Sequence, residues 1–280
     1  MSVILHIETA TKNCSVSIGQ SGEIIALKEL YSERFSHSEH LHDFIKVVLE
    51  EAQIDITSLD AVAVSKGPGS FTGLRIGVAA AKGICFALNL PLIAVNSLQI
   101  LSEKYQSRNQ AILFPMFDAR RMEIYVMALN ENKEILKPTF AEVLSAESFN
   151  EFPTNVQWVF MGEGAEKYKK VSDAPHIKYQ SEIRYPSAAE MVSLAWKAFQ
   201  DKNFMKNRLG HDQTFGELPL EKINIYGGSL SLGHPFAATG GRLLTTASKR
   251  LQKENAKYAV VAGCAAGGHG SAILLENPNL

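Results

Sequence analysis

The pattern of hydrophobic and polar positions in the first 100 residues changes between strand-like and helix-like periods. Residues 3–7 form a short apolar run typical of a buried strand, and residues 14–18 alternate as a half-buried strand does. Apolar side chains then recur at helical spacing over 41–49. Residues 72–88 are rich in Gly and Ala and are expected to form a helix that packs closely on the sheet. Further strands are expected at 24–27, 61–64 and 92–95. This order predicts a mixed sheet flanked by helices, an α/β architecture.

The middle of the chain predicts a second unit of the same class. Strands are expected at 112–117, 122–129 and 156–160. Ser187 and Glu190 fit a capping box that opens a helix ending near residue 202. Ser36 and Glu39 fit the same pattern before the first helix.

The character of the sequence changes after about residue 205. Glycines gather around His234, a helix is expected over 235–254, and "YAVVAGC" and "SAILLE" predict two strands. We therefore expect units at 1–100, 101–204 and 205–280.

Composition narrows the class of protein. The chain has 280 residues, 46% of them hydrophobic, which predicts a globular protein. The apolar runs are shorter than the ~20 residues that span a bilayer, and the N-terminus lacks the pattern of a secretory signal. We therefore expect no membrane partner. The three cysteines are widely spaced, so a reducing cytoplasm is the expected location.

The charge of the chain bears on nucleic-acid binding. The net charge is −1, and the basic residues are scattered apart from small groups at 120–121 and 167–170. A stand-alone nucleic-acid binder usually carries a basic face. If RNA is involved, another subunit is expected to supply most of the contacts.

The stretch "SKGPGSFTGLRIG", residues 65–77, raises the question of phosphate binding. Glycines before a helix can cradle phosphate, but Lys66 precedes the glycines, whereas the Walker pattern places its lysine after them. A tight strand-to-helix turn is therefore the favoured interpretation, with anion binding and a partner surface left open.

Two other segments are candidates for a metal or phosphate site. Glu8, Thr9 and Thr11 lie in the first hairpin connection, where such residues can hold a metal–phosphate but are also ordinary loop residues. His37 and His40 are three apart, not four as in zinc-binding helices. No metal site is predicted.

His234 and Cys264 are candidates for acid–base or nucleophilic chemistry. Both lie beside glycine-rich turns, where a histidine can act as a general base and a tuned cysteine can transfer a proton. A capping histidine and a buried cysteine are the plainer alternative.

Residues 1 to about 205 resemble the TsaB (YeaZ) family. The resemblance is carried by "ILHIETATKNCSVSIG", "FSHSEHL", "VSKGPGSFTGLRIGVAAAKGICFALNLPLIAVNSL", "DARRMEIYV", "MGEGA" and "YPSAAEM". It implies an actin/Hsp70-like body made of two ribonuclease-H-type units. It also implies a cytoplasmic, non-catalytic subunit of the complex that adds threonylcarbamoyl to the tRNA adenosine beside the anticodon.

The resemblance also implies partners and a surface. The partners are a TsaD-like catalytic subunit, a TsaE-like ATPase and tRNA bound through the complex, with a homodimer when the chain is alone. ATP and threonylcarbamoyl-adenylate are used by the complex, and no cofactor is expected on this chain by itself. We expect the partner surface at Gly69, Phe71, Thr72, Gly73, Arg75 and Gly77. Glu8, Thr9 and Thr11 are the candidates for contact with a nucleotide.

The tail, from about residue 203 to 280, resembles the C-terminal end of a thiolase, an acetyl-CoA acyltransferase. "PLEKINIYGGSLSLGHPFAATGGRLLTTASKRLQ" and "YAVVAGCAAGGHGSAILLE" carry this resemblance. It implies that His234 activates a nucleophilic cysteine and that Cys264 moves a proton. The half of a thiolase that holds the nucleophile has no counterpart here, so acyltransferase activity is kept as an alternative with an incomplete site. A metallopeptidase is a third alternative, and it lacks its ligands.

The chain is thus similar to two truncated relatives joined near residues 192–208, through a gene fusion or an assembly artefact. One helix and two strands bury too few side chains to offset the ordering of the backbone, which costs ~1–2 kcal/mol per residue. We therefore expect the tail to dock on the body, to borrow a partner or to remain loosely ordered.

Overall fold

The structure, a computed structural model, describes residues 2–32, 37–106, 109–205, 239–265 and 269–278. The chain divides into two compact units, Met1–Lys206 and Asn207–Leu280.

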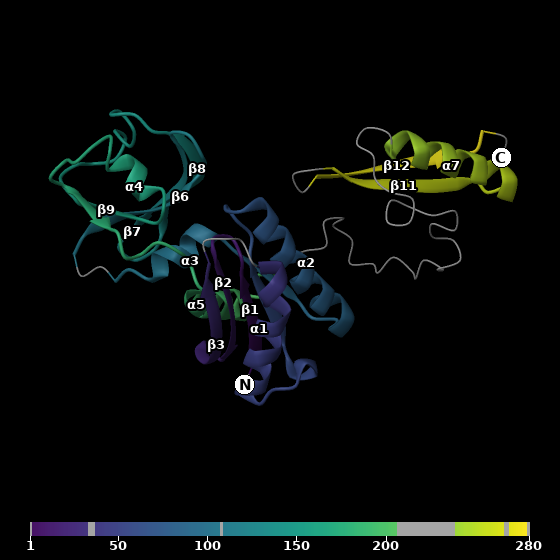
Figure 1. The fold of residues 1–280 in the computed structure, drawn as a ribbon, viewed down its shortest axis with the longest axis horizontal. Helices are drawn as coiled ribbons and strands as arrows, with labels where there is room; N and C mark the ends of the chain where they lie inside the picture. Colours follow the sequence, from purple (N-terminus) through teal and green to yellow (C-terminus); the bar gives the residue numbers. More distant parts are fainter. Residues whose placement is uncertain (1, 33–36, 107–108, 206–238, 266–268, 279–280) are drawn as a thin grey trace. The chain divides into compact units, whose positions relative to one another are not determined.

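The first sheet of the larger unit has five strands in the order β3-β2-β1-β4-β5 (Figure 1). These strands are β1 (Val3–Glu8), β2 (Asn13–Gln20), β3 (Glu23–Tyr31), β4 (Ala61–Ser65) and β5 (Leu92–Val95). The first three pair antiparallel, and β4 and β5 run parallel to β1. The predicted mixed sheet is therefore confirmed.

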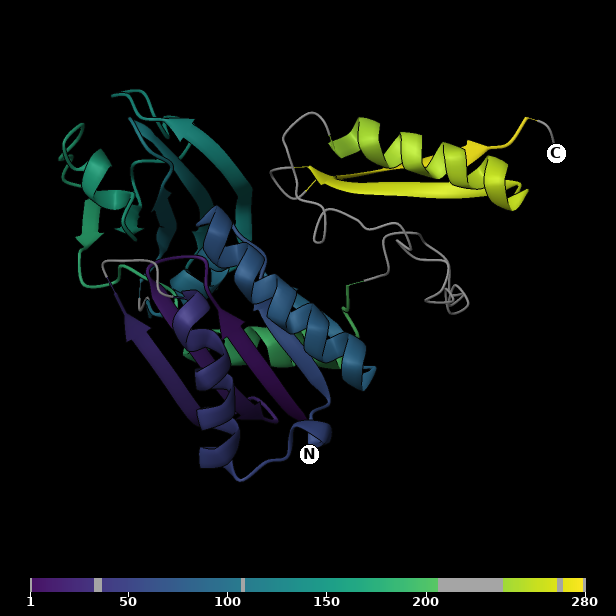
Figure 2. The ribbon, with the colours of Figure 1, turned by 45° about the vertical axis from the view of Figure 1, so that its right-hand side comes forward.

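Helices cover both faces of this sheet because β1 is apolar on both sides. Leu5 and Ile7 pack towards α1 (His37–Ala52) and α2 (Phe71–Leu88). Ile4, on the opposite face, packs towards α5 (Ala188–Gln200). Figure 2 shows α1 and α2 side by side in front of the strands, with α5 behind. Helix α5 thus returns from the end of the larger unit to its first sheet.

The second sheet repeats the topology of the first. Its order is β10-β9-β6-β7-β8, with β6, β7 and β8 antiparallel and β9 and β10 parallel to β6. The strands are β6 (Ala111–Asp118), β7 (Glu123–Asn130), β8 (Ile135–Val143), β9 (Gln157–Met161) and β10 (Ile177–Gln180). Two sheets with one topology agree with the expected pair of ribonuclease-H-type units.

Short helices complete the second sheet. An aromatic cluster around Phe114, Phe149 and Trp158 lies on the face that carries α4 (Ala165–Tyr168). Helix α3 (Ser97–Glu103) packs on the other face through Leu98 and Leu101. One further 3-10 turn, η1 (Ile56–Ser58), precedes β4.

Five elements were not expected from the sequence: α3, α4, η1, β8 and β10. Helices α3 and α4 have 7 and 4 residues, and β10 has 4, so each is too short to show a clear period. Strand β8 is half exposed and contains Pro138, which favours a sheet edge, where β8 indeed lies.

The smaller unit is a helix packed on a hairpin. Helix α7 (Thr239–Glu254) contacts β11 (Tyr258–Ala265), which pairs antiparallel with β12 (His269–Glu276). The expected helix began at 235, and its first residues lie outside the described part of the chain. The predicted helix and hairpin of the thiolase-like tail are confirmed.

Candidate partner interface

The loop between β4 and α2 forms a tight turn against the β1–β2 connection. Ser70 caps α2, since its hydroxyl accepts a hydrogen bond from Gly73 N at 3.2 Å. The Ser70 N–H donates to the Ala10 carbonyl at 2.6 Å. Gly69 has a φ of 153° and faces Ala10 so closely that a Cβ would collide with the Ala10 carbonyl. The favoured interpretation of this stretch, a strand-to-helix turn, agrees with this geometry.

Two glycines bring α2 close to the same connection. A Cβ on Gly73 would collide with the Thr9 carbonyl oxygen, and one on Gly77 would collide with the Thr9 hydroxyl. Both glycines are buried. Of the six residues expected at the partner surface, Gly69, Gly73 and Gly77 therefore face inward and position α2. The surface itself is left to Phe71, Thr72 and Arg75.

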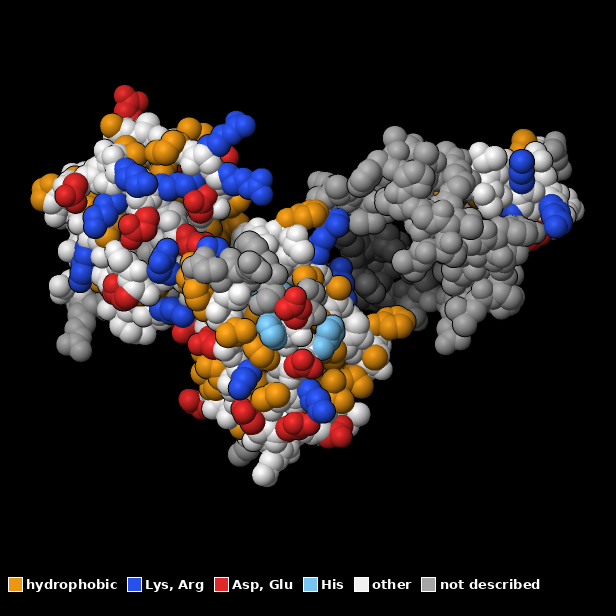
Figure 3. All heavy atoms as spheres, in the orientation of Figure 1, with side chains coloured by type: hydrophobic (Ala, Val, Ile, Leu, Met, Phe, Trp, Pro, Cys, Tyr) orange, Lys and Arg blue, Asp and Glu red, His pale blue; other side chains and the backbone are white. Residues whose placement is uncertain are grey.

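The outer face of α2 exposes large apolar side chains. Phe71 is 50% exposed and Phe86 is 92% exposed. The Arg75 guanidinium lies 4.3 Å from the centre of the Phe71 ring. We call the part of the larger unit built on the first sheet its first lobe, and the part built on the second sheet its second lobe. Figure 3 shows hydrophobic side chains at the surface of the first lobe, which carries α1 and α2. An exposed face of this kind favours contact with another molecule.

Two hollows meet at His42 of α1, and one of them borders α2. One, of about 460 Å³, lies between α1 and α2. Its lining residues are His42, Ile76, Ala79, Ala80, Gly83 and Ile84. The other, of about 520 Å³, continues along α1 towards η1. Both are shallow and mainly apolar, as a groove for a partner helix would be.

Helix α2 is also the one helix of the described chain that is long and apolar enough to cross a membrane. Its 18 residues have a mean hydropathy of 1.4. Length and composition alone are weak evidence for a membrane-spanning helix, because core helices of soluble proteins share them. The close docking of α2 through Gly73 and Gly77 accounts for its apolar inner face.

The three residues proposed for nucleotide contact lie beneath the surface. Glu8, Thr9 and Thr11 are all 5% exposed or less. Glu8 Oε1 accepts a hydrogen bond from Ala10 N at 2.6 Å. Burial raises the pKa of Glu8 to about 7. With Gly77 packed on Thr9, these side chains line no open surface, and their role towards a nucleotide stays a prediction.

His37 supports the same connection. It is buried at the start of α1, with its Nε2 2.7 Å from the Thr11 carbonyl. Burial lowers the pKa of His37. Ser36, the expected cap before it, lies outside the described residues. Across the described part of the chain, no three His, Cys, Asp or Glu side chains are grouped as a metal site would require.

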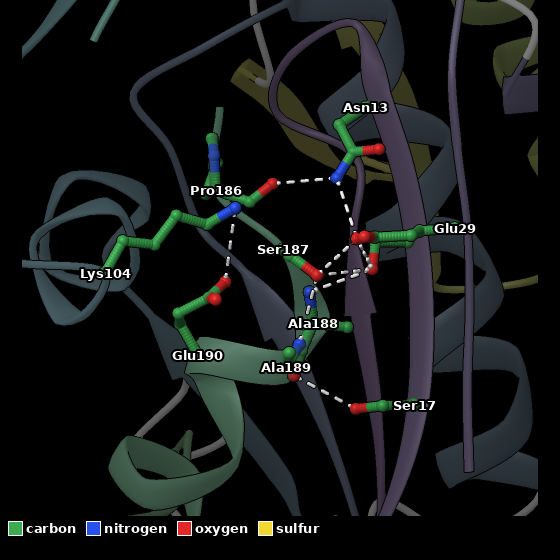
Figure 4. Close-up of polar contacts among 10 residues, drawn as sticks. Asn13, Ser17, Glu29, Lys104, Pro186, Ser187, Ala188, Ala189 and Glu190 are labelled. Atoms are coloured by element: carbon green, nitrogen blue, oxygen red, sulfur yellow. Dashed lines mark hydrogen bonds and ion pairs between the residues drawn. The ribbon is translucent and has the colours of Figure 1, made fainter. Parts of the chain in front are cut away.

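A polar network fastens the start of α5 to β2 and β3 (Figure 4). The Ser187 hydroxyl donates to Glu29 Oε2 at 2.6 Å and accepts from Ala189 N at 3.2 Å. Asn13 Nδ2 donates to Glu29 Oε2 at 3.2 Å and to the Pro186 carbonyl at 3.1 Å. The helix predicted from Ser187 is therefore confirmed, and its cap also fixes the helix to the first sheet.

Two carboxylates of this network carry opposite pKa shifts. Burial raises the pKa of Glu29, but hydrogen bonds from Ser187 and Asn13 outweigh it and hold the pKa below its ordinary value. Burial raises the pKa of Glu190, and Lys104, with its Nζ 3.7 Å from Glu190 Oε2, only partly offsets this. The network is therefore a structural anchor in which the pKa of one carboxyl is lowered and that of the other is raised.

The thiolase-like pair cannot be placed as a site. His234 lies outside the described residues, and so does the side chain of Cys264. The backbone of Cys264 lies in β11, opposite Gly270 of β12. The predicted roles of His234 and Cys264 stay predictions.

Sequence reasoning missed the residues that fix the start of α5 to the first sheet. Asn13, Ser15 and Glu29 lie on strands whose partners come from residues 186–188, more than 150 positions later. No local pattern signals such a pairing. The one available signal was that "YPSAAEM" places a strong cap after a proline.

Comparisons with known proteins agree with this architecture. The YeaZ structure from Pseudomonas aeruginosa has a TM-score of 0.64 and 27% sequence identity, and covers 74% of this chain and 96% of its own. A second structure from that organism, titled as similar to peptidase YeaZ, has a TM-score of 0.62 and 26% identity, covering 73% and 95%. The tRNA threonylcarbamoyladenosine biosynthesis protein TsaB of Escherichia coli is 27% identical over 71% of this chain and 87% of its own.

The C-terminal segment matches another group of proteins. The beta subunit of the mouse mitochondrial trifunctional enzyme is 53% identical over 81 residues, 29% of this chain. This chain spans only 17% of that relative's length. The sequence model of TsaD, described as tRNA N6-adenosine threonylcarbamoyltransferase, matches residues 33–267. The chain therefore belongs to the TsaD family, is TsaB-like or YeaZ-like over most of its length, and ends in a thiolase-like segment.

Proposed function

We propose that this chain is a non-catalytic scaffold and dimerisation subunit in the biosynthesis of threonylcarbamoyladenosine on tRNA. Similarity to TsaB and YeaZ supports involvement in that pathway, and the TsaD family match supports a complex that contains a TsaD-type subunit. In this proposal a TsaE-type ATPase and tRNA join the same complex in the cytoplasm. The chain forms a homodimer when alone.

The observation that carries the scaffold role is the outer face of α2. Its inner side is fixed by buried glycines, Phe71 and Phe86 are exposed, and other residues of the helix line an apolar hollow. Burying apolar surface contributes ~25 cal/mol per Å², so a partner helix in this groove would be stabilised. Glu8, Thr9 and Thr11 are buried, which fits a scaffold better than an open catalytic site.

The experiment places a charge in the groove. Ala79 is exposed and lines the hollow beside α1, so Ala79→Glu should disrupt docking without disturbing the core. We expect the variant to lose co-elution with a TsaD-type subunit and to elute as a monomer when alone. Val143→Glu is the matched control, because Val143 is 70% exposed on β8 of the other lobe. Val143→Glu should associate as the unaltered chain does.

Two results would reject the proposal. One is a wild-type chain that neither associates with the TsaD-type subunit nor supports tRNA modification with the other subunits. The other is full association by Ala79→Glu. Residues 1–205 are tested in parallel to separate an effect of the tail. Binding of the wild-type chain to lipid vesicles in place of the protein partner would favour a membrane role for α2.

A second candidate function is acyl transfer to or from coenzyme A by the C-terminal segment. The observation that favours it is the 53% identity with the trifunctional enzyme subunit. Thiolytic cleavage of a 3-ketoacyl-CoA by the purified chain, lost in His234→Ala, would support it. Absence of cleavage with substrates of every acyl-chain length tested would reject it.

A further inference from the structure

The structure joins two basic groups that are separate in the sequence. Arg120 and Arg121 form the connection between β6 and β7, and Lys167 belongs to α4. Lys167 Nζ donates to Asp118 Oδ1 at 2.7 Å and to the Glu123 carbonyl at 3.0 Å. Lys167 of the second group therefore lies beside the connection that carries the two arginines. We refer to Arg120 and Arg121 as the arginine turn.

The backbone of the arginine turn is in a conformation that disfavours arginine. The φ angles are 70° at Arg120 and 45° at Arg121, in the left-handed region where Gly and Asn are preferred. Both side chains are exposed. Consecutive strained residues at an exposed tip are typical of positions where the side chains serve binding.

The local charges leave the two guanidinium groups available. Asp118, the nearest acid in sequence, already accepts from Arg120 N at 2.6 Å and from Lys167. No ion pair joins Arg120 or Arg121 to a carboxylate within the described residues. Acidic residues of the adjoining elements are Glu123 in β7, Glu142 in β8 opposite Ile124, and Glu166 in α4. Figure 3 shows Lys and Arg side chains over the lobe with β6–β9, with acidic ones among them.

We propose that the arginine turn binds backbone phosphates of RNA, so that this subunit itself contacts tRNA in the complex. This inference rests on the proposed function. Arginine suits the task because its planar guanidinium donates two parallel hydrogen bonds to a phosphate. An exposed hairpin tip fits an extended polyanion better than a small nucleotide, which requires a concave site. The net charge of −1 limits this to an auxiliary contact.

The test measures binding of fluorescently labelled tRNA to the full chain by anisotropy, over a series of salt concentrations. The variant Arg120→Asn/Arg121→Gly places residues that prefer positive φ at the turn. We expect its melting temperature to equal or exceed that of the wild type, while tRNA affinity falls at least tenfold. The slope of log affinity against log salt should fall by about two, one for each phosphate that an arginine no longer neutralises.

The matched control removes two positive charges elsewhere. Lys28→Gln/Lys46→Gln alters exposed lysines of β3 and α1 in the other lobe, and it should leave the salt slope within half a unit of the wild type. An equal fall in affinity for this control would overturn the proposal, because bulk charge would then explain binding. A wild-type chain without tRNA affinity, or an arginine-turn variant that keeps it, would also overturn it.

Two further measurements separate this proposal from its alternatives. Loss of ATP affinity with unchanged tRNA affinity would overturn it in favour of a nucleotide site. Co-elution of the arginine-turn variant with the TsaD-type subunit should be unchanged. Failed co-elution by the wild type would reject the scaffold role, and tRNA binding would still be decided by the anisotropy series.

Discussion

Single residues of the larger unit carry buried ionisable groups whose effects on stability oppose each other. Burial raises the pKa of Glu8 to about 7 and lowers the pKa of His6 to about 4. Between pH 4.5 and 6.5 the folded state binds more protons than the unfolded state at Glu8 and fewer at His6. The two effects on the free energy of unfolding therefore cancel in part over this range.

Glu8→Gln separates the two effects. Because the folded pKa of Glu8 lies above its unfolded value, its contribution to stability is fully present below about pH 4.5 and is lost as pH rises towards about 7. The stability of the wild type relative to Glu8→Gln should fall by roughly 1.4 kcal/mol per pH unit over that range. His6 is present in both proteins and drops out of the difference. Urea denaturation at several pH values measures it, and a difference independent of pH would show that Glu8 is ionised in the fold.

The structural role of a residue could be predicted from the sequence only where that role depends on its neighbours along the chain. Ser70 and Ser187 were in recognisable turn or cap patterns and do cap helices. Glu8 was selected for its chemistry, but its burial depends on α2 and on Ser65 in β4, which no local pattern reveals. The same limit applies to the arginine turn: the sequence shows two arginines, and only the backbone angles show that they occupy disfavoured positions.

At the scale of elements, the docking of α2 depends on which glycines face the sheet. Gly73 and Gly83 lie on the same helix and differ in surroundings. A Cβ at Gly73 would collide with the backbone of Thr9, whereas one at Gly83 would meet no atom within 4 Å. The glycine-rich sequence of α2 predicted close packing, but it did not distinguish these positions.

We expect Gly73→Ala to destabilise the protein by about 1–3 kcal/mol, since the backbone must shift to admit the methyl group. Gly83→Ala should stabilise it by up to ~1 kcal/mol, because alanine favours the helix. Thermal denaturation of the two variants measures this contrast. Equal effects would show that α2 does not lie against the β1–β2 connection. Both variants should be tested as residues 1–205 as well, so that the tail does not mask the transition.

Elements were predicted correctly where the hydrophobic pattern along the chain is clear, and they were missed where the element is short or exposed. Helix α1 has a clear amphipathic period, and the buried strands β1 and β4 are short apolar runs. The predicted positions of all three are close to the observed ones. Strand β8 has exposed Leu136 and Val143, and its position is fixed by pairing with β7 rather than by its own pattern. Helix α5 was predicted, but its return to the first sheet was not, because that contact depends on Ser187 and Glu29.

At the scale of the whole molecule, the two compact units differ in how they are stabilised. The larger unit has two five-stranded sheets, each covered by helices. The smaller has one helix on a two-stranded hairpin, and Leu251 of the helix is buried. The other face of the hairpin leaves Tyr258, Val260 and Leu274 at least 52% exposed. Isolated two-stranded hairpins are marginally stable, and among the described residues of its own unit this one has only α7 to cover it.

Amide hydrogen exchange on the full chain should therefore separate the two units. We expect amides in β11 and β12 to exchange at least 100-fold faster than those in β1 and β6, because exchange rates follow the free energy of local opening. The comparison uses only amides that donate to a neighbouring strand, because β11 and β12 each have one such neighbour and β1 and β6 each have two. The difference then reports covering by other elements. Slow exchange in β11 and β12 of a monomer would show that the hairpin is covered by something other than α7. Slow exchange that appears only with a TsaD-type subunit present would identify that subunit as the cover, and would extend its contact with this chain beyond α2.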